Sequence, residues 1–237
     1  MLKFDLHIHT IQSLCGLHTY LEVMNEASRR GLHGIAITDH GGVLGGPGIN
    51  KIFVERFPDK YKGLKIWKGI EANVLPDDGT DVPLELISKL DIVLLGFHEN
   101  IPLGKSEEYY TRLLISSLQA NPCVDVLVHP DMRSYPLNIK RIVDTAASLG
   151  IAIEFNNANI MYKRTNMDKL KELAQAVQKT GCRAIMSSDA HCISNIGEDK
   201  DIVKTLTTFG IQVPIINSTF ESLCNFIEER RAKKGLA

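Results

Sequence analysis

Near its start the chain reads Leu2-Lys3-Phe4-Asp5-Leu6-His7-Ile8-His9, an alternating apolar and polar run that carries two histidines at its end. Alternation with a period of two predicts a β-strand, in which His7 and His9 point to the same face. Short runs rich in β-branched residues recur along the whole chain. We predict seven strands, at Leu2 to His9, Gly34 to Thr38, Leu64 to Asn73, Asp91 to Phe97, Val124 to Val128, Ile151 to Phe155 and Arg183 to Ser187.

Longer amphipathic segments separate these strands. Helices are predicted at Thr19 to Arg30, Ile49 to Phe57, Leu84 to Lys89, Ser106 to Gln119, Asn138 to Leu149, Met167 to Lys179, Asp199 to Phe209 and Ser218 to Lys233. Repeated strand and helix alternation predicts a parallel α/β sheet, and closure into a barrel is its most economical form for 237 residues. Because no Pro/Ser-rich linker divides the chain, we expect one domain over residues 1–237.

The composition argues against a disordered, collagen-like or coiled-coil chain. Hydrophobic residues make up 44% and charged residues 23% of the chain, as in ordinary soluble domains. Lys plus Arg number 27 and Asp plus Glu 28, so the net charge of -1 gives no reason to expect nucleic acid or a membrane as partner. Five cysteines without a CxxC pair argue against a disulfide framework. With no secretory signal recognised at the N-terminus, we expect a cytoplasmic location.

Six of the eight histidines fall at or just beyond the C-terminal ends of predicted strands: His7, His9, His40, His98, His129 and His191. Glu71, on the third strand, and Asp189, after the last, occupy equivalent places. The C-terminal ends of parallel strands meet at one face of a barrel, where catalytic groups gather. Imidazoles with a few carboxylates suit Zn, Mn or Fe better than Ca or Mg, so the cluster predicts a metal site.

These histidines belong to motifs that resemble the PHP (polymerase and histidinol phosphatase) family, and especially its small stand-alone phosphatases of the YcdX type. The motifs are Asp5-Leu6-His7-Ile8-His9-Thr10, Ile37-Thr38-Asp39-His40-Gly41, Gly69-Ile70-Glu71-Ala72-Asn73, Gly96-Phe97-His98-Glu99, Val128-His129-Pro130 and Ser188-Asp189-Ala190-His191. The resemblance implies a distorted (β/α)7 TIM-like barrel, three metal ions and hydrolysis of phosphate esters. It implies a first ion on His7, His9, Glu71 and Asp189, a second on Glu71, His98 and His129, and a third on His40 and His191.

The chain departs from the family pattern after its first strand. Where the family usually has another histidine that binds the third ion, this chain has Cys15, and His18 follows three residues later. Either Cys15 binds as a thiolate, or His18 substitutes through a different loop path, or the third site is weak or empty. A thiolate is a good zinc ligand, and we favour Cys15.

A centre of this kind favours an anionic substrate. A phosphate ester can bridge the ions while a metal-bound water of lowered pKa attacks phosphorus in line with the leaving alcohol. Glu71 is expected to bridge two ions, and Asp189, His191 or a metal-bound water can protonate the leaving group. Asp39 and Asp5 are candidates for orienting imidazoles. The expected substrate contacts are an amide at Asn156 and the cations Arg133, Lys163 and Arg164, which suit a second anionic group.

Three functions are compared. A phosphatase acting on small phosphate monoesters fits best. A PHP-type nuclease or nucleotide phosphoesterase is the first alternative, although the neutral charge and an aromatic content of 6% do not favour nucleic acid. A metal-binding scaffold without catalysis is the second. The sequence does not identify the substrate, the metal or the oligomeric state.

Overall fold

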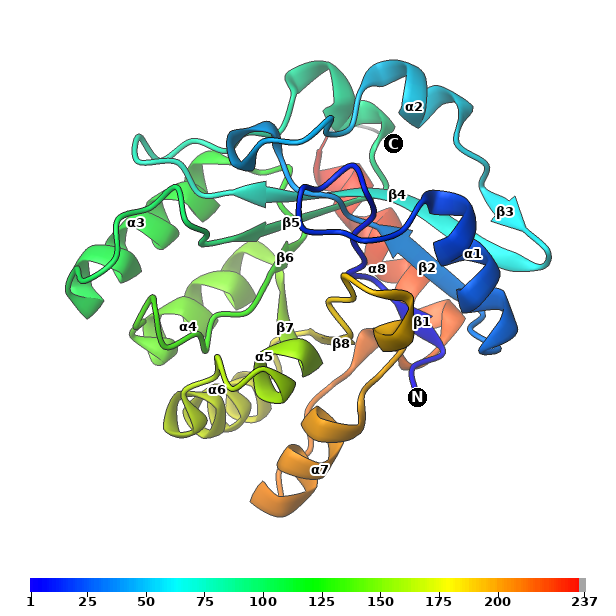
Figure 1. Cartoon of the computed structure of the whole chain (residues 1–237). Helices are drawn as coiled ribbons and strands as arrows, with labels where there is room; N and C mark the ends of the chain where they lie inside the picture. Colours follow the sequence, from blue (N-terminus) through cyan, green and yellow to red (C-terminus); the bar gives the residue numbers. More distant parts are fainter. Residues whose placement is uncertain (235–237) are drawn as a thin grey trace.

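Parallel strands form a nearly closed barrel in the middle of the molecule (Figure 1). The structure is a computed structural model, which describes residues 1–234 except the side chain at position 53. In sheet order the strands are β1 (Phe4–Asp5), β2 (Gly34–Ile37), β4 (Leu64–Asn73), β5 (Ile92–Gly96), β6 (Val126–Leu127), β7 (Ala152–Asn156) and β8 (Ala184–Ser187). The chain after β1 meets the chain after β8 at the parallel bridge between Ile8 and Ala190, which closes the ring at its C-terminal end. The predicted α/β barrel is confirmed.

Helices surround the strands on the outside of the barrel (Figure 1). They are α1 (Tyr20–Arg29), α2 (Lys51–Arg56), α3 (Glu107–Ala120), α4 (Ile139–Leu149), α5 (Asn157–Met161), α6 (Met167–Thr180), α7 (Lys200–Phe209) and α8 (Phe220–Lys233), with 3-10 turns η1 (Gly42–Leu44), η2 (Leu84–Lys89), η3 (Ile193–Asn195) and η4 (Ile216–Ser218). Local signals fix their ends. Thr19 and Glu22 form a capping box at α1, and Gly150 ends α4 with φ of 71°.

The observed elements differ from the predicted ones in two ways: some strands are shorter, and some elements are additional. The first strand and the fifth are much shorter than predicted, since β1 and β6 have only two residues each. One strand and one α-helix were not predicted. The short strand β3 (Lys60–Tyr61) pairs antiparallel with β4 across a turn in which Lys62 and Gly63 have positive φ. Helix α5 follows β7 directly because the Asn156 side chain accepts a hydrogen bond from the Asn159 N–H and caps it.

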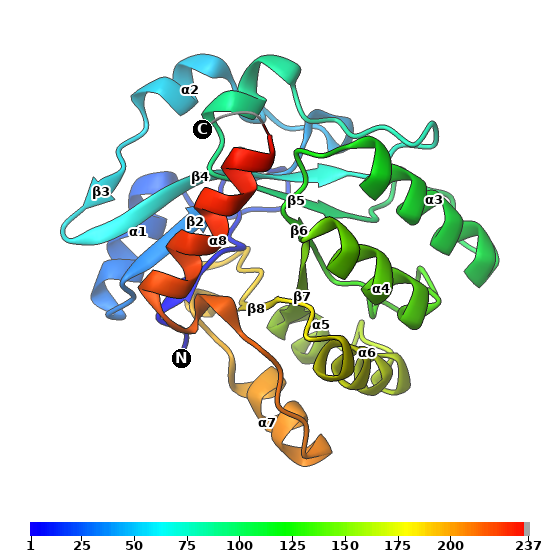
Figure 2. The same ribbon diagram turned by 180° about the vertical axis from the view of Figure 1, so that it is seen from behind.

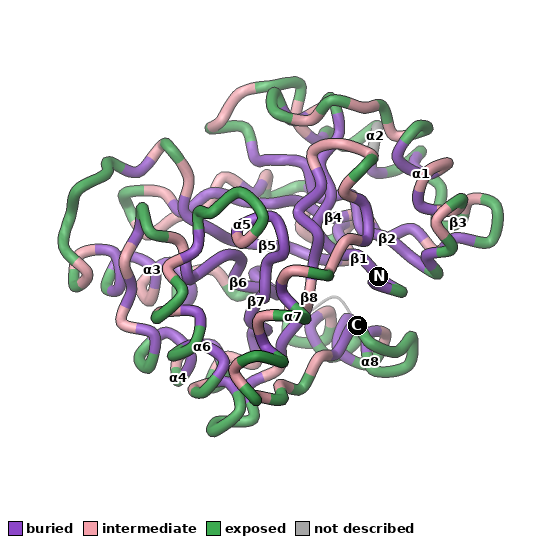
Figure 3. The backbone as a smooth tube through the Cα atoms, turned by 60° about the horizontal axis from the view of Figure 1, so that its bottom comes forward, coloured by how far each residue is buried: buried purple, intermediate pink, exposed green. Residues whose placement is uncertain are grey.

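The interior of the barrel is apolar, and α8 covers its N-terminal end (Figure 2). Phe4, Leu94 and Val126 on the strands lie in one buried cluster with Leu223 and Phe226 of α8. Figure 3 shows the buried strands inside a largely exposed outer layer of helices and loops. One end of the barrel is therefore closed by packing, and the opposite end, where the strands finish, remains available for a functional site.

A buried ion cluster holds α8 in this position. The Arg230 Nε lies 3.1 Å from the Asp125 carboxylate, and the Lys234 Nζ lies 2.6 Å from the other oxygen of the same group. The Arg230 guanidinium also donates to the backbone oxygens of Leu149, Pro122 and Val124. Since all these groups precede β6 or β7, one side chain joins α8 to the start of two strands.

No helix within residues 1–234 has the length and apolar character needed to cross a lipid bilayer.

Replacing Arg230 should weaken the fold strongly. Arg230→Ala leaves the buried Asp125 carboxylate without one partner and exposes three carbonyl oxygens to an apolar surrounding, so we expect a loss of about 3–5 kcal/mol in the free energy of unfolding. Urea denaturation measures this loss. The matched control is Arg231→Ala, which removes a partly exposed pair with Asp91 and should cost less than about 1 kcal/mol. Equal losses in the two variants would contradict the role given to the buried cluster.

Candidate metal centre

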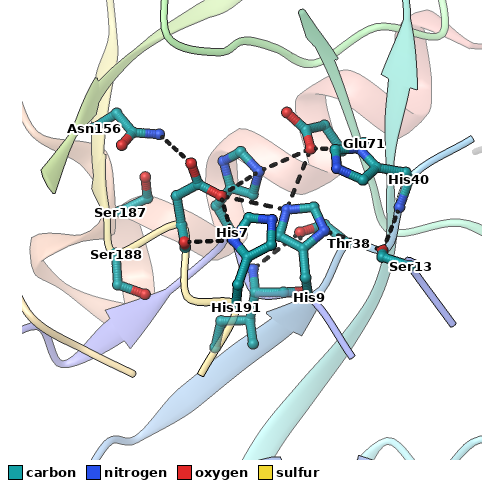
Figure 4. Close-up of polar contacts among 12 residues, drawn as sticks. His7, His9, Ser13, Thr38, His40, Glu71, Asn156, Ser187, Ser188 and His191 are labelled. Carbon is teal, nitrogen blue, oxygen red and sulfur yellow. Dashed lines mark hydrogen bonds and ion pairs between the residues drawn. The ribbon is translucent and has the colours of Figure 1, made fainter. Parts of the chain in front are cut away.

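The buried carboxylate of Glu71, on β4, lies against a group of histidines, of which Figure 4 labels His7, His9 and His40. Five imidazole nitrogens lie within 3.2 Å of its two oxygens: His7 Nε2 (3.2 Å), His9 Nε2 (3.2 Å) and His40 Nδ1 (2.9 Å) beside Oε2, and His98 Nε2 (3.0 Å) and His129 Nε2 (2.8 Å) beside Oε1. These imidazoles come from the segments that follow four strands, β1, β2, β5 and β6. The structure thus brings the predicted histidines together around Glu71.

The second carboxylate, Asp189, joins the ring from the segment after β8. Its Oδ1 lies 3.5 Å from His7 Nε2, 3.3 Å from His9 Nε2 and 3.5 Å from His191 Nδ1. Three sets of ligand atoms lie close enough together to hold an ion, each set within 4.8 Å: His7, His9 and Glu71; His40, Glu71 and His98; and His9, Cys15, His40 and His191. His40 therefore lies close to both the second and the third of these sets.

Cys15, rather than His18, lies with the third set of ligands. The His18 Nε2 lies 3.6 Å from the sulfur of Cys192 instead. Burial by itself raises the pKa of Cys15, but hydrogen bonds with His191 and His40 outweigh it and lower the pKa to about 6. A thiol with this pKa is available as the thiolate that metal ions bind.

The buried polar atoms of the ring fit divalent metal ions. His7 Nε2, His9 Nε2, His40 Nδ1 and Glu71 Oε2 are buried, and none has a hydrogen-bond partner within the described residues, although each of the three nitrogens lies within 3.2 Å of Glu71 Oε2. Buried polar atoms without partners are costly and rare in folded proteins. Imidazole lone pairs and a carboxylate that converge without bonding one another form a donor set for Zn, Mn or Fe.

Electrostatics favours the ligand forms of the carboxylates. Burial raises the pKa of Glu71, but the surrounding imidazoles, His7 and His98 foremost, bring it well below its usual value. The same balance lowers the pKa of Asp189. Burial lowers the pKa of His40, whereas the Glu71 carboxylate raises it, and the result is a pKa of about 10. Protons and metal ions compete for these nitrogens, so ion binding must release protons.

Glu154 on β7 orients two of the candidate ligands. Its carboxylate accepts hydrogen bonds from His7 Nδ1 (2.7 Å) and from the backbone N–H of His129 (2.8 Å). It also accepts from the Ser187 hydroxyl and the Asn156 amide. Because His7 donates through Nδ1, its Nε2 lone pair is free for an ion. Sequence reasoning did not foresee this role; the only signal was an acidic residue on an otherwise apolar buried strand.

A second orienting path runs from Asp39 through Ser13 to His9. The Ser13 hydroxyl donates to Asp39 (2.7 Å) and so accepts from His9 Nδ1 (3.2 Å), which leaves the His9 Nε2 lone pair free. Asp39 also accepts from the Thr10 N–H and hydroxyl, and these bonds fix the path of the loop that carries Cys15. Asp5, the other expected orienting acid, instead holds the backbone of Ser188 and Gly197 and contacts no imidazole side chain among the described residues.

The backbone is strained where two candidate ligands lie. His129 has φ of 37° and Asp189 has φ of 51°, in the left-handed region that residues with side chains seldom adopt. Gly96 makes room for one of them, because a Cβ at Gly96 would lie 2.5 Å from His129 Cε1. The chain therefore accepts unfavourable conformations in order to place these two side chains.

A cavity of about 850 Å³ opens above the ring. Cys15, His40, His98 and His191 lie at its wall, and three of the four predicted substrate contacts, Arg133, Lys163 and Arg164, also line it. Asn156 does not line it. Its amide is buried and donates to Glu154 and Asp189 (3.1 Å each), so the structure places it beneath the cavity in a position to orient Asp189.

Comparison with known proteins decides the family. The family model described as the PHP domain matches residues 5–233. The chain belongs to the PHP family. A protein of Caldanaerobacter subterraneus subsp. tengcongensis named as a probable phosphatase is 32% identical, over 99% of this chain and 94% of its own length. A second probable phosphatase, from Acetivibrio thermocellus, is also 32% identical, over 97% of this chain and 96% of its own.

Two solved structures share the fold. Histidinol phosphate phosphatase from Lactococcus lactis subsp. lactis, complexed with zinc, L-histidinol and phosphate, matches with a TM-score of 0.61 and 17% identity over 89% of this chain and 95% of that one. A chain of archaeal ribonuclease P with mature tRNA also gives a TM-score of 0.61, at 16% identity over 97% of this chain and 91% of that one. At these identities the likeness concerns the barrel alone.

Filling the space at Gly96 should disturb the centre without disturbing the barrel at large. In Gly96→Ala the new methyl group overlaps the His129 ring, so we expect the apo protein to bind one Zn²⁺ fewer, or to bind it at least about tenfold more weakly. Calorimetric titration with Zn²⁺ measures both quantities. Gly42→Ala is the matched control, since a Cβ there meets open space and should change neither. Identical titrations for the two variants would remove His129 from the centre.

Proposed function

We propose that this protein is a metal-dependent phosphatase that hydrolyses small phosphate monoesters at a trinuclear centre formed around Glu71. The observation that carries the proposal is the set of buried, unpartnered imidazole and carboxylate atoms beside a cavity of about 850 Å³. Such a cavity admits a small molecule, and ions held at its wall would give that wall a positive charge. A phosphate ester meets both conditions.

The class of reaction rests on the family. The PHP domain spans nearly the whole chain, and relatives aligned over nearly their full length are named as probable phosphatases, so the chain is a phosphoric ester hydrolase. The Lactococcus histidinol phosphate phosphatase of the same fold is complexed with zinc and phosphate, which supports zinc as the first metal to test here. The ligand set also suits Mn and Fe.

We assign three groups of ligands. His7, His9, Glu71 and Asp189 would hold the first ion, and Glu71, His98 and His129 the second. Cys15, His40 and His191 would hold the third, in support of which their ligand atoms lie within 4.8 Å of one another and of His9. The nearness of His40 to Glu71 and His98 makes it the residue that couples the second and third groups.

Bound divalent ions supply two things, a water of lowered pKa and neutralisation of charge on the phosphate oxygens. The protein's own groups do the rest. Glu154 and Ser13 keep His7 and His9 in the tautomers that offer Nε2. His191, whose Nδ1 lies 3.5 Å from the Asp189 Oδ1, can hold and pass the proton that the leaving alcohol requires, and the Asp189 carboxylate stabilises its protonated form. Asn156 fixes the Asp189 carboxylate through its second oxygen.

Elemental analysis of the purified protein, together with turnover of p-nitrophenyl phosphate, tests the proposal. We expect about three Zn, Mn or Fe ions per chain, turnover that a chelator abolishes and an added metal restores, and no comparable cleavage of single-stranded DNA or RNA. Turnover of the nucleic acids in place of the small ester would favour the nuclease alternative. Metal binding without turnover of either substrate would leave a scaffold.

The third ion should depend on Cys15. Because Cys15 lies with His40 and His191, Cys15→Ala is expected to lower the metal content from about three ions to about two and to reduce kcat/KM for p-nitrophenyl phosphate more than about tenfold. His18→Ala is the matched control, because His18 contacts Cys192 and lies outside the three sets of ligands; it should keep both values within about twofold. Loss of an ion in the His18 variant only would transfer the ligand role to His18.

A further inference from the structure

Two loops at the cavity carry three cations on one joined piece of backbone. Arg133 follows β6, and Lys163 and Arg164 follow α5. An antiparallel bridge joins Met132 to Thr165, the Arg133 N–H donates to the Arg164 oxygen (3.0 Å), and the Arg133 Nε donates to the Thr165 oxygen (2.7 Å). The three cations therefore do not lie on independent flexible loops. They form a group, the cationic ridge, defined by Arg133, Lys163 and Arg164.

The charge of the cationic ridge is not balanced by protein carboxylates. In the described part of the chain, none of its three side chains forms an ion pair, whereas many other basic side chains do, such as Arg30 with Glu198 and Lys169 with Glu107. The Arg164 guanidinium instead lies over the ring of Tyr162, 5.5 Å from its centre. Among the described residues lining the cavity, Glu99 is the only carboxylate. Three cations against one acid leave an excess of positive charge for a ligand to neutralise.

The cationic ridge and part of the metal centre line the same cavity, and apolar side chains form another part of its wall. Phe97, Leu103, Met132 and Tyr135 contribute to that wall. A cavity of about 850 Å³ is at the upper end of the sizes that hold whole cofactors and drug-sized ligands, and far exceeds what one phosphate group fills. A substrate that occupies it must therefore carry an organic scaffold reaching from the centre toward the ridge.

We propose that the natural substrate of this site carries a second phosphate group, which the cationic ridge binds while the first phosphate lies at the metal centre and is hydrolysed. The inference rests on the proposed phosphatase function and specifies its substrate class as a bisphosphorylated small molecule. Guanidinium groups pair with phosphate oxygens through two parallel N–H bonds, and Lys163 adds a point charge, so a phosphate dianion matches the ridge better than a carboxylate does. The apolar wall contacts the scaffold that joins the two phosphates.

A series of matched esters tests the proposal. The probes are α,ω-alkanediol bisphosphates of two to six carbons, the alkyl monophosphates of the same lengths, and the corresponding ω-phosphoalkanoates, which end in a carboxylate. For at least one length we expect kcat/KM for the bisphosphate to exceed that for the monophosphate about tenfold or more, beyond the factor of two that its two equivalent phosphates give by chance. The preference should shrink at high salt, because exposed cations are screened.

The variant Arg133→Gln/Lys163→Gln/Arg164→Gln should reduce the preference for the bisphosphate to about twofold. Lys204→Gln is the matched control, since Lys204 is an exposed cation on α7, outside the cavity lining, and should leave the preference intact. Both proteins are compared by circular dichroism and thermal unfolding, because the Arg133 side chain also donates to the Thr165 oxygen and its loss must be separated from loss of the cations. The charge-preserving Arg133→Lys/Arg164→Lys variant should recover part of the preference.

A binding experiment distinguishes failure of this proposal from failure of the proposed phosphatase function. Calorimetry on the metal-loaded protein measures the binding of unreactive bisphosphonates and monophosphonates of the same lengths. A preference for bisphosphonate that the triple Gln variant loses supports the second phosphate site even if no ester is hydrolysed, an outcome that sinks only the proposed function. The proposal is overturned if no length shows a preference, if the preference survives the triple variant, or if the carboxylate series is preferred as strongly as the bisphosphates.

Discussion

The structure depends on one constraint, a buried carboxylate that five imidazoles approach, of which only His98 and His129 are hydrogen-bonded to it. Glu71 is 1% exposed, and the unpartnered nitrogens of His7, His9 and His40 lie within 3.2 Å of it. Burying so many polar atoms is expensive unless something charged pairs with them. Divalent cations would bind these nitrogens and the Glu71 carboxylate as ligands, in place of the protons that compete for them. The strained backbones of His129 and Asp189 are explained by the same requirement.

The contacts that stabilise the barrel and the residues of the candidate metal centre lie at opposite ends of the strands. At the N-terminal ends of the strands, α8 closes the interior with Leu223 and Phe226 and is fixed by the Arg230 and Asp125 pair. At the opposite ends, short strands such as β1 pass directly into loops that carry His7, His9 and Cys15. Because the core is complete without these loops, they are free to hold polar side chains in arrangements that no packing argument favours.

The sequence predicted the parts of the molecule that local patterns encode. Period-two alternation placed His7 and His9 on one face, and the amphipathic pattern predicted that α4 ends at Leu149. Contacts between residues far apart in the chain could not be predicted from these local patterns. Nothing near Cys15 reveals that Asp39, on another strand, fixes its loop through Ser13 and so brings Cys15 rather than His18 to the cluster. Asn156 was predicted as a substrate contact because it ends a strand, but its amide donates to Asp189 instead. The role of Glu154 depends on His129 and His7, which lie 25 and 147 residues away in the sequence.

The claim that the ring of histidines around Glu71 is a metal centre is tested most directly by anomalous X-ray diffraction from crystals of the metal-loaded protein. The data are recorded on both sides of the zinc edge and then of the manganese and iron edges. The account predicts three anomalous peaks, two of them within about 2.0–2.3 Å of Glu71 oxygens and one within bonding distance of the Cys15 sulfur. A map without peaks beside Glu71, and with an imidazole bonded to its carboxylate in their place, would contradict the claim that this ring of histidines is a metal centre.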